Sequence, residues 1–186
     1  MAPSAADNPE RPLANTYWVI PGRFLAGEYP GDWDPREAAT KLNTLLRAGI
    51  SHFIDLTRLQ EQLEPYVEIA KSEADSLGLS PRFERHPITD MSIPSSPEQM
   101  TGILDAIDAA MADGRNVYVH CLGGVGRTGT VVGCWFVRHC RSGDEALAEI
   151  AERWKHVEKF PIFPTSPQTS DQRRYVRRWA ELSQGG

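Results

Sequence analysis

The chain has 186 residues, of which 40% are hydrophobic, 9% aromatic and 24% charged, and its formal net charge is −5. These values fit one compact domain with a full core and exclude a charge-rich, aromatic-poor disordered chain. The acidic balance argues against general affinity for nucleic acid or anionic lipid, so neither a nucleic acid nor a membrane is expected as a partner. Any anion that binds must be held by a local site.

The two ends of the chain and its cysteines indicate in which cellular compartment the protein is expected. Residues 1–14 hold three prolines and no apolar segment of signal-peptide type, so we expect a disordered arm there, a single domain over residues 15–182 and a flexible tail over 183–186. The longest apolar stretch, residues 131–137, is much shorter than the roughly 20 residues that span a bilayer. Three cysteines, at positions 121, 134 and 140, form no framework of pairs. Together these features predict a soluble, cytoplasmic protein with reduced thiols.

The first half of the chain predicts strands that alternate with helices. Apolar residues at 17–20 and 23–26, separated by Pro21 and Gly22, indicate a short hairpin or two edge strands. Asp34 begins a helix that ends before Gly49. The other elements expected here are a strand over residues 52–56, a helix over 65–77 and a strand over 82–88.

The second half continues the alternation. Ser96, Pro97 and Gln99 form a capping box for a helix that stops at Gly114. The remaining elements are a strand over residues 116–120 and helices over 127–140, 144–155 and 168–182. Cys134 and Cys140 are expected to be core residues of the apolar helix. The alternation predicts an α/β fold whose central sheet is flanked by helices on both faces.

A glycine-rich turn joins the strand 116–120 to the apolar helix, with the sequence His-Cys-Leu-Gly-Gly-Val-Gly-Arg-Thr-Gly over residues 120–129. Glycines let the backbone N–H groups turn inward, and a helix N-terminus adds partial positive charge. The predicted phosphate-binding residues are Leu122, Gly123, Gly124, Val125, Gly126 and Arg127. Arg127 can hold two phosphate oxygens with its planar fork. The same field favours the thiolate of Cys121, which can then attack phosphorus.

Two neighbours of the cysteine have expected supporting roles. The hydroxyl of Thr128 can donate to the thiolate as it departs in the second step, and His120 is expected to order the turn through hydrogen bonds rather than act as a base. A nucleotide-binding P-loop is disfavoured, because the GxxxxGK(S/T) spacing fails and no lysine is present in the turn.

A leaving alkoxide or phenoxide needs a proton, and Asp90 is the best candidate donor. It lies in residues 87–94, a segment bounded by prolines that follows a predicted strand and precedes the well-capped helix. Such a loop can fold over the cradle.

The turn resembles the signature loop of the protein tyrosine phosphatase superfamily, HCxxGxxR(S/T), which is matched by His120, Cys121, Gly124, Arg127 and Thr128. The resemblance implies the phosphatase-type α/β fold and a phosphocysteine intermediate. Asp90 and Pro94 are similar to the family's general-acid loop, although Ile88 and Thr89 stand where many tyrosine-specific members have tryptophan. Gln168 and Gln172 match the two glutamines of the family's water-positioning loop. The small size resembles the dual-specificity branch, while the glutamine segment is more typical of the tyrosine-specific branch.

Other polar residues are expected to be structural. Asp55 and Thr57 end a strand and are interpreted as satisfied polar residues. The histidines at 52, 86, 139 and 156 have no metal-ligand spacing. The arginines at 173, 174, 177 and 178 are interpreted as a solvated helix face.

The resulting hypothesis is a phosphatase that acts on protein phosphotyrosine, with phosphoserine and phosphothreonine as a second activity. Its partner is a phosphorylated protein or peptide; no metal and no cofactor are expected, and the oligomeric state is left open. The alternatives are a phosphoinositide or RNA/nucleotide phosphatase of the same superfamily and a non-catalytic phosphate-binding module. A reductase of the low-molecular-weight phosphatase or arsenate type is disfavoured. Those enzymes have their cysteine near the N-terminus, whereas Cys121 follows 120 residues.

Overall fold

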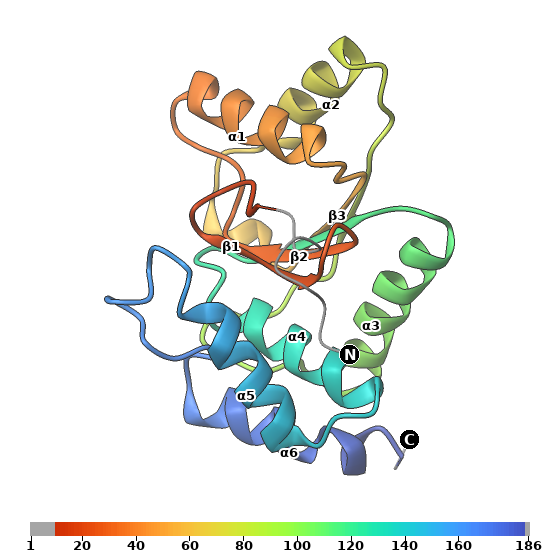
Figure 1. Ribbon diagram of the computed structural model, residues 1–186, viewed down its shortest axis with the longest axis vertical. Coiled ribbons are helices and arrows are strands. Elements are labelled where there is room, and N and C mark those ends of the chain that lie inside the picture. Colours follow the sequence, from red (N-terminus) through yellow and green to blue (C-terminus); the bar gives the residue numbers. More distant parts are fainter. Residues whose placement is uncertain (1–9, 185–186) are drawn as a thin grey trace.

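Five short strands form one sheet at the centre of the computed structural model, which describes residues 10–184 (Figure 1). The strands are β1 (Thr16–Ile20), β2 (Phe24–Gly27), β3 (His52–Asp55), β4 (Arg82–Arg85) and β5 (Val117–His120), in the order β1-β2-β5-β3-β4. The hairpin partners β1 and β2 are antiparallel, and the other neighbouring pairs are parallel. Because β2 also pairs with β5, it is not an edge strand, and the hairpin alternative of the sequence analysis is the right one.

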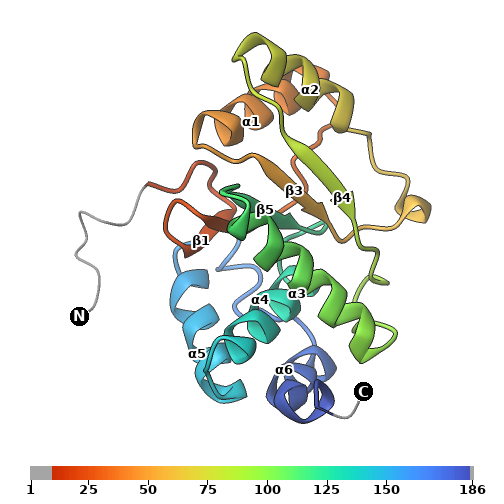
Figure 2. The same cartoon turned by 90° about the vertical axis from the view of Figure 1, so that its right-hand side faces the viewer.

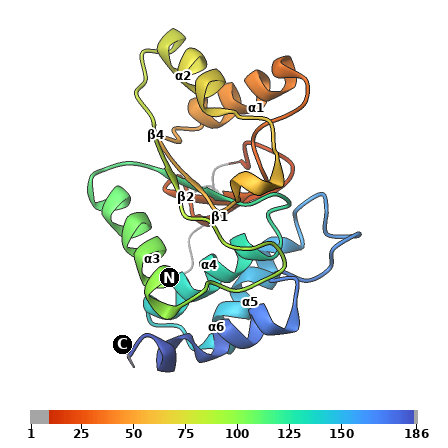
Figure 3. The ribbon, with the colours of Figure 1, turned by 180° about the vertical axis from the view of Figure 1, so that it is seen from behind.

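Helices cover both faces of this sheet, as the sequence predicted (Figure 2). They are α1 (Pro35–Arg47), α2 (Val67–Ser76), α3 (Pro97–Ala112), α4 (Arg127–Arg138), α5 (Gly143–Trp154) and α6 (Ser170–Leu182). Seen from behind, α1 and α2 lie on one side of the sheet and α3 to α6 on the other (Figure 3). Parallel strands need such cover, since both of their faces are apolar.

The alternation of side chains along β5 divides the core into two clusters. Val117 and Val119 point to the α3–α6 side, while Tyr118 points to the α1–α2 side. Helix α4 is buried along its length from Arg127 to Val137, because α3, α5 and α6 surround it on the side away from the sheet. This burial fixes the start of α4 firmly against the end of β5.

The predicted caps set the helix starts. Asp34 accepts a hydrogen bond from the N–H of Arg36, and Ser96 accepts one from the N–H of Gln99. Gly49, Gly78 and Gly114 follow the ends of α1, α2 and α3, and the bounds predicted for these three helices lie within a few residues of those observed.

The prediction for Cys140 was wrong. Helix α4 ends at Arg138, since the apolar run stops at Val137, and Cys140 follows in a left-handed conformation with φ 71° and an exposed side chain. Cys134, in contrast, is buried within α4 as expected.

The predicted N-terminal arm lies partly outside the described residues, which begin at Glu10. Within the described part, Leu13 packs against the α1–α2 cluster and the indole of Trp18 donates to the carbonyl of Glu10 at 3.4 Å. The last two residues of the predicted tail also lie outside it. Over residues 10–184, none of the helices has the length and apolar character needed to cross a membrane.

Candidate active site

The carboxyl ends of β3 and β5 lie side by side, and the segments that follow these strands build the site. Asp55 at the end of β3 is aligned with His120 at the end of β5. In parallel sheets this edge is the usual place for a ligand, because loops from neighbouring strands converge there. The turn 121–126 follows β5, and a 3₁₀ turn, Leu59–Glu61, follows β3.

The turn 121–126 forms a cradle whose carbonyl groups are directed outward. Each of four carbonyls accepts a hydrogen bond from elsewhere: Leu122 from the N–H of Tyr29 (3.0 Å), Gly123 from Nζ of Lys159 (3.3 Å), Val125 from the hydroxyl of Ser166 (2.8 Å) and Gly126 from the N–H of Thr130 (2.9 Å). In the described part of the chain, the N–H groups of residues 122–126 donate to no backbone carbonyl. These donors therefore remain for an anion at the N-terminus of α4.

Packing leaves little room for a side chain at two of the three glycines in the cradle. Gly124 has φ 74°, and a Cβ there would lie 2.6 Å from the carbonyl carbon of Gly27. A Cβ on Gly126 would lie 2.9 Å from the amide of Gln172. At Gly123 the closest atom would be 3.6 Å away, an ordinary contact. The cradle is thus wedged between β2 and α6.

Cys121 and Arg127 lie at the two ends of the cradle, and both are buried, with 3% and 1% exposure. Nη1 and Nη2 of Arg127 donate to the two carboxylate oxygens of Glu61 at 2.5 and 2.9 Å. Burial alone would lower the pKa of Arg127, but the hydrogen bonds to Glu61 and the negative charges of Cys121 and Asp90 raise it. The guanidinium therefore stays charged. Within residues 10–184 its Nε has no hydrogen-bond partner, which leaves the Nε edge for a bound anion.

Glu61 is a site residue that sequence reasoning missed. Burial would raise its pKa, but hydrogen bonds from Arg127 and from the N–H of Arg58 lower it below the usual value. Glu61 thus holds one edge of the Arg127 fork as a carboxylate. The signal that could have found it is its place in a polar segment directly after β3, at the same sheet edge as the cradle.

Asp90 forms a second ion pair with Arg127. Its Oδ1 is 3.0 Å from Nη2 of Arg127, and its side chain is 56% exposed. The next residue, Met91, has φ 59° and is also exposed. The structure therefore brings Asp90, the predicted proton donor, to the arginine of the cradle.

Side chains from three directions hold the segment 87–94 in place. The amide of Gln99 donates to the carbonyl of Pro87 at 2.7 Å, the amide of Gln172 to the carbonyl of Ser92 at 3.0 Å, and Arg58 to the hydroxyl of Thr89 at 3.2 Å. All three contacts involve polar side chains rather than a strand ladder or a helix. Such contacts can exchange with water when a loop moves.

His120 is fully buried, and its Nε2 lies 2.8 Å from the hydroxyl of Tyr66. Desolvation by burial lowers the pKa of His120 to about 4, against smaller opposing contributions that include the charge of Asp55. The ring is therefore neutral near pH 7. Tyr66, which sequence reasoning also missed, supplies its hydrogen-bond partner from the segment before α2.

The two predicted glutamines differ in position. Gln172 is fully buried against Gly126; its carbonyl accepts from the N–H of Thr169 and its amide donates to Ser92. Gln168 lies before α6 and is half-exposed, and its side chain has no hydrogen bond within the described chain. Only Gln172 contacts both the cradle and the Asp90 loop.

The other predicted residues have structural contacts. The hydroxyl of Thr128 donates to the carbonyl of Gly27 at 3.5 Å, and Asp55 accepts from the N–H and hydroxyl of Thr57 and from Arg85. Three of the arginines interpreted as a solvated face make surface ion pairs with acidic neighbours. Among residues 10–184 there is no group of three His, Cys, Asp or Glu side chains that could hold a metal.

A sheet covered on both faces, with a Cys–Arg cradle at the end of its central strand, defines the protein tyrosine phosphatase superfamily, and the comparisons agree with this class. Residues 31–141, more than half of the chain, match the family model "Tc-R-P: Polymorphic toxin system, DSP-PTPase phosphatase". The chain belongs to this family.

Individual relatives are more distant. The chain is 29% identical over 121 residues, 63% of its length, to a protein of Invertebrate iridescent virus 3 whose name describes a tyrosine phosphatase. It is 32% identical over 103 residues, 54% of its length, to "Phosphatidylinositol 3,4,5-trisphosphate 3-phosphatase and protein-tyrosine-phosphatase PTEN1" of Arabidopsis thaliana. The chain covers only 44% and 23% of the lengths of these two relatives.

The solved structure of Tk-PTP in its active form superposes with a TM-score of 0.69 at 24% identity. The match covers 92% of this chain and 98% of that one. This likeness supports the fold over almost the whole chain.

Proposed function

We propose that the chain hydrolyses protein phosphotyrosine through a phosphocysteine intermediate, with Cys121 as nucleophile, Arg127 as phosphate clamp and Asp90 as proton donor. Phosphoserine and phosphothreonine are a slower second class of substrate. The observation that carries the proposal is the arrangement of Arg127. Glu61 holds one edge of its fork, the Nε edge is free, and Asp90 lies 3.0 Å from Nη2.

In the first step the thiolate of Cys121 attacks phosphorus in line, and the P–O bond to the leaving group breaks as the P–S bond forms. The free N–H groups of residues 122–126 and the Nε edge of Arg127 stabilise the charge on the equatorial oxygens. Asp90, protonated at this stage, gives its proton to the leaving oxygen. Phosphate binding at Arg127 displaces the Asp90 carboxylate from Nη2, and the displaced carboxylate takes up a proton from solvent before it acts as the donor.

In the second step water attacks the phosphocysteine, the P–S bond breaks and the thiolate is restored. The Asp90 carboxylate accepts the proton of that water. Gln172 contacts Gly126 of the cradle and Ser92 of the acid loop, so it can orient the water between them. Thr128 can stabilise the departing thiolate if its hydroxyl turns away from the carbonyl of Gly27, and Gln168 is the more peripheral of the two glutamines.

The depth of the site favours an aryl ester. Cys121 is 3% exposed and Arg127 1%, so the phosphate must reach a buried position. A phenyl ring spans this depth better than the short alkyl group of serine. Leu122, which is 44% exposed at the rim, offers an apolar contact for a ring rather than a charge for an inositol phosphate.

The test is to compare kcat/KM for a phosphotyrosine peptide, a phosphoserine peptide, phosphoinositide vesicles and an RNA 5′-triphosphate. Phosphotyrosine is expected to be the best substrate, and Cys121→Ser is expected to lower its turnover roughly 10⁴-fold or more, because serine is not ionised in this field. Faster hydrolysis of an inositol lipid or an RNA end would overturn the substrate assignment. A Cys121→Ser protein that retains most of its activity would overturn the mechanism.

A further inference from the structure

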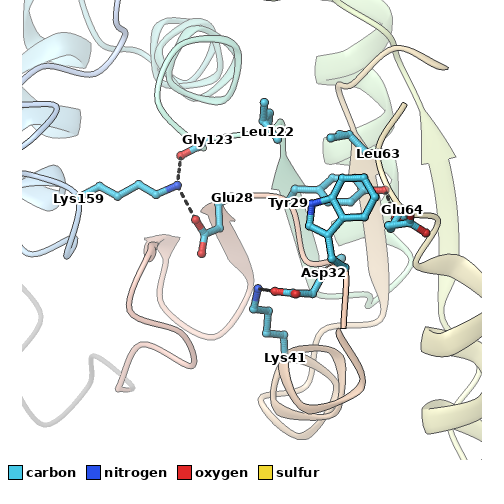
Figure 4. Close-up of a pocket in the computed structure, with 11 residues that line it drawn as sticks. Glu28, Tyr29, Asp32, Lys41, Leu63, Glu64, Leu122, Gly123 and Lys159 are labelled. Carbon is cyan, nitrogen blue, oxygen red and sulfur yellow. Dashed lines mark hydrogen bonds and ion pairs between the residues drawn. The ribbon is translucent and has the colours of Figure 1, made fainter. Parts of the chain in front are cut away.

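A second cavity opens beside the cradle and shares two of its residues. It has a volume of about 290 Å³, and Leu122 and Gly123 of the cradle form part of its wall (Figure 4). The rest of the wall comes from the segment after β2, from α1, from the segment before α2 and from the segment after α5. The lining residues outside the cradle are Glu28, Tyr29, Gly31, Asp32, Trp33, Lys41, Leu63, Glu64 and Lys159.

Hydrogen bonds tie the wall of this cavity to the cradle. The N–H of Tyr29 donates to the carbonyl of Leu122, and its hydroxyl donates to the carbonyl of Glu64 at 2.9 Å. Lys159 donates to the carbonyl of Gly123 and pairs with Glu28 at 2.5 Å. A substrate whose phosphate lies in the cradle therefore has its flanking groups beside a cavity of fixed position.

The charges of the cavity are acidic on balance. Three carboxylates line it with two ammonium groups, and each ammonium group is already paired, Lys159 with Glu28 and Lys41 with Asp32 at 2.7 Å. Glu64 is the remaining carboxylate, and within residues 10–184 it has no ion-pair partner. Figure 4 shows Glu64 and Leu63 across the cavity from Lys159 and Glu28. The unmatched charge of the cavity is thus negative.

The cavity also has an exposed aromatic wall. Trp33 is 81% exposed, the most exposed of the large hydrophobic side chains over residues 10–184, and Tyr29 lies in the same lining. A solvent-facing indole and an unpaired carboxylate in the wall of one cavity are a combination that recognises a cation, because the ring face attracts positive charge and the carboxylate pairs with it.

We propose that this cavity binds an arginine or lysine side chain next to the phosphorylated residue of a peptide substrate, with Trp33 and Glu64 as the specificity-determining residues. The inference rests on the proposed function, since it adds a sequence preference to the same site. A second phosphate, as on an inositol headgroup, does not fit the charge of the cavity, since it would have to displace the carboxylate partners of Lys41 and Lys159.

The experiment compares phosphotyrosine peptides that carry arginine, glutamine or glutamate at the positions flanking the phosphotyrosine. The wild-type protein at low ionic strength is expected to give a kcat/KM about three- to tenfold higher for the best arginine peptide than for its glutamine counterpart. Added salt should reduce this ratio. Each variant is judged by the ratio of kcat/KM for the arginine peptide to kcat/KM for the glutamine peptide. A change in the chemical step affects both peptides equally and therefore cancels in this ratio.

Substitutions at Trp33 and Glu64 test whether these two residues cause the preference for the arginine peptide. Trp33→Ala and Glu64→Gln should each bring the arginine-to-glutamine ratio toward one, while Trp33→Phe keeps part of it. Glu68→Gln is the matched control, because Glu68 is an exposed glutamate nearby in sequence that pairs with Lys71 outside the cavity. This control should leave the ratio unchanged.

The outcomes separate the inference from the proposed function. Hydrolysis of all peptides with equal kcat/KM, or an arginine preference that survives both Trp33→Ala and Glu64→Gln, would overturn the inference alone. A preference for the glutamate peptide that depends on Lys41 would show an anion site and overturn it too. Hydrolysis of nitrophenyl phosphate or inositol lipid with no hydrolysis of any peptide would instead overturn the proposed function.

Discussion

The cradle and the Asp90 loop both contact Arg127 but are held in different ways. The cradle is buried, its carbonyls are satisfied by four surrounding segments, and Gly124 fits against the backbone of β2. The segment 87–94 is anchored at its start by buried Ile88, whose N–H donates to the carbonyl of Leu56. From there it presents Asp90 and Met91 to solvent, and its other contacts come from long polar side chains. The cradle supplies electrostatic stabilisation, which depends on preorganised groups. The segment 87–94 supplies a proton, which requires a group that can approach the substrate and withdraw from it.

After loss of the nucleophile, a change at the clamp should have the largest effect on activity. Arg127→Lys keeps the positive charge but loses the planar fork, so Glu61 and the phosphate can no longer be held by two edges of one group. We expect kcat/KM for an aryl phosphate to fall about 10²- to 10³-fold. Arg138→Lys, at the exposed end of the same helix, is the matched control. Near-normal kinetics in Arg127→Lys would show that this residue is not the clamp.

The rigidity of the cradle can be tested with two neighbouring glycines. Gly124→Ala places a Cβ against Gly27 at positive φ, whereas Gly123→Ala places one in ordinary contact. We expect the first variant to lose about 2 to 4 kcal/mol of unfolding free energy and about 10²-fold in kcat/KM, and the second to lose little. Chemical denaturation and steady-state kinetics measure both quantities. Equal behaviour of the two variants would contradict a wedged cradle.

Removing the proton donor should have an effect that depends on the leaving group. Asp90→Asn cannot give a proton, and a tyrosine phenolate benefits from one more than a nitrophenolate does. We expect a loss of about tenfold to 10²-fold on phosphotyrosine and a smaller loss on nitrophenyl phosphate. Because Asp90 is exposed, the unfolding midpoint should stay near that of the wild type. Equal losses on both substrates at every pH would move the donor role to another residue.

The sequence predicted the parts of the site that are contiguous in the chain. The cysteine, the glycines and the arginine of the cradle lie within seven consecutive positions, 121–127, so their mutual geometry follows from one strand-to-helix turn. Asp90 was found because prolines and a capped helix marked its loop. The helices were placed by their caps and glycines, and the error at Cys140 arose where no cap signal marked the end of α4.

Glu61, Tyr66 and the Trp33 cavity could not be predicted in the same way. Glu61 and Arg127 are far apart in the chain, and only the parallel pairing of β3 with β5 brings the segments after these strands together. The cavity is lined by four segments besides the cradle. Such contacts depend on tertiary packing, which local periodicity and capping do not encode.

The last prediction concerns the pH dependence of stability through His120, which links the cradle to the α1–α2 side of the fold. Burial lowers its pKa to about 4, below the value of about 6.5 that an unfolded chain would show. Between these two values the unfolded state binds a proton that the folded state does not, so the unfolding free energy falls as the pH drops from about 6.5 to about 4. The expected contribution is roughly 3 kcal/mol over this window, with no further loss from this residue below it.

His120→Asn removes the titrating ring and keeps a side chain that can hydrogen-bond to Tyr66. Urea denaturation of both proteins from pH 7 to pH 4 measures the prediction, because the carboxylates titrate in both and cancel in the difference. The variant should be less stable near pH 7, where it has lost a well-packed ring, and the gap should narrow as the pH falls. Curves that stay parallel over the whole range would mean that His120 takes up its proton at the same pH in the folded and unfolded states, and the lowered pKa of the buried ring would then be the wrong description of this end of β5.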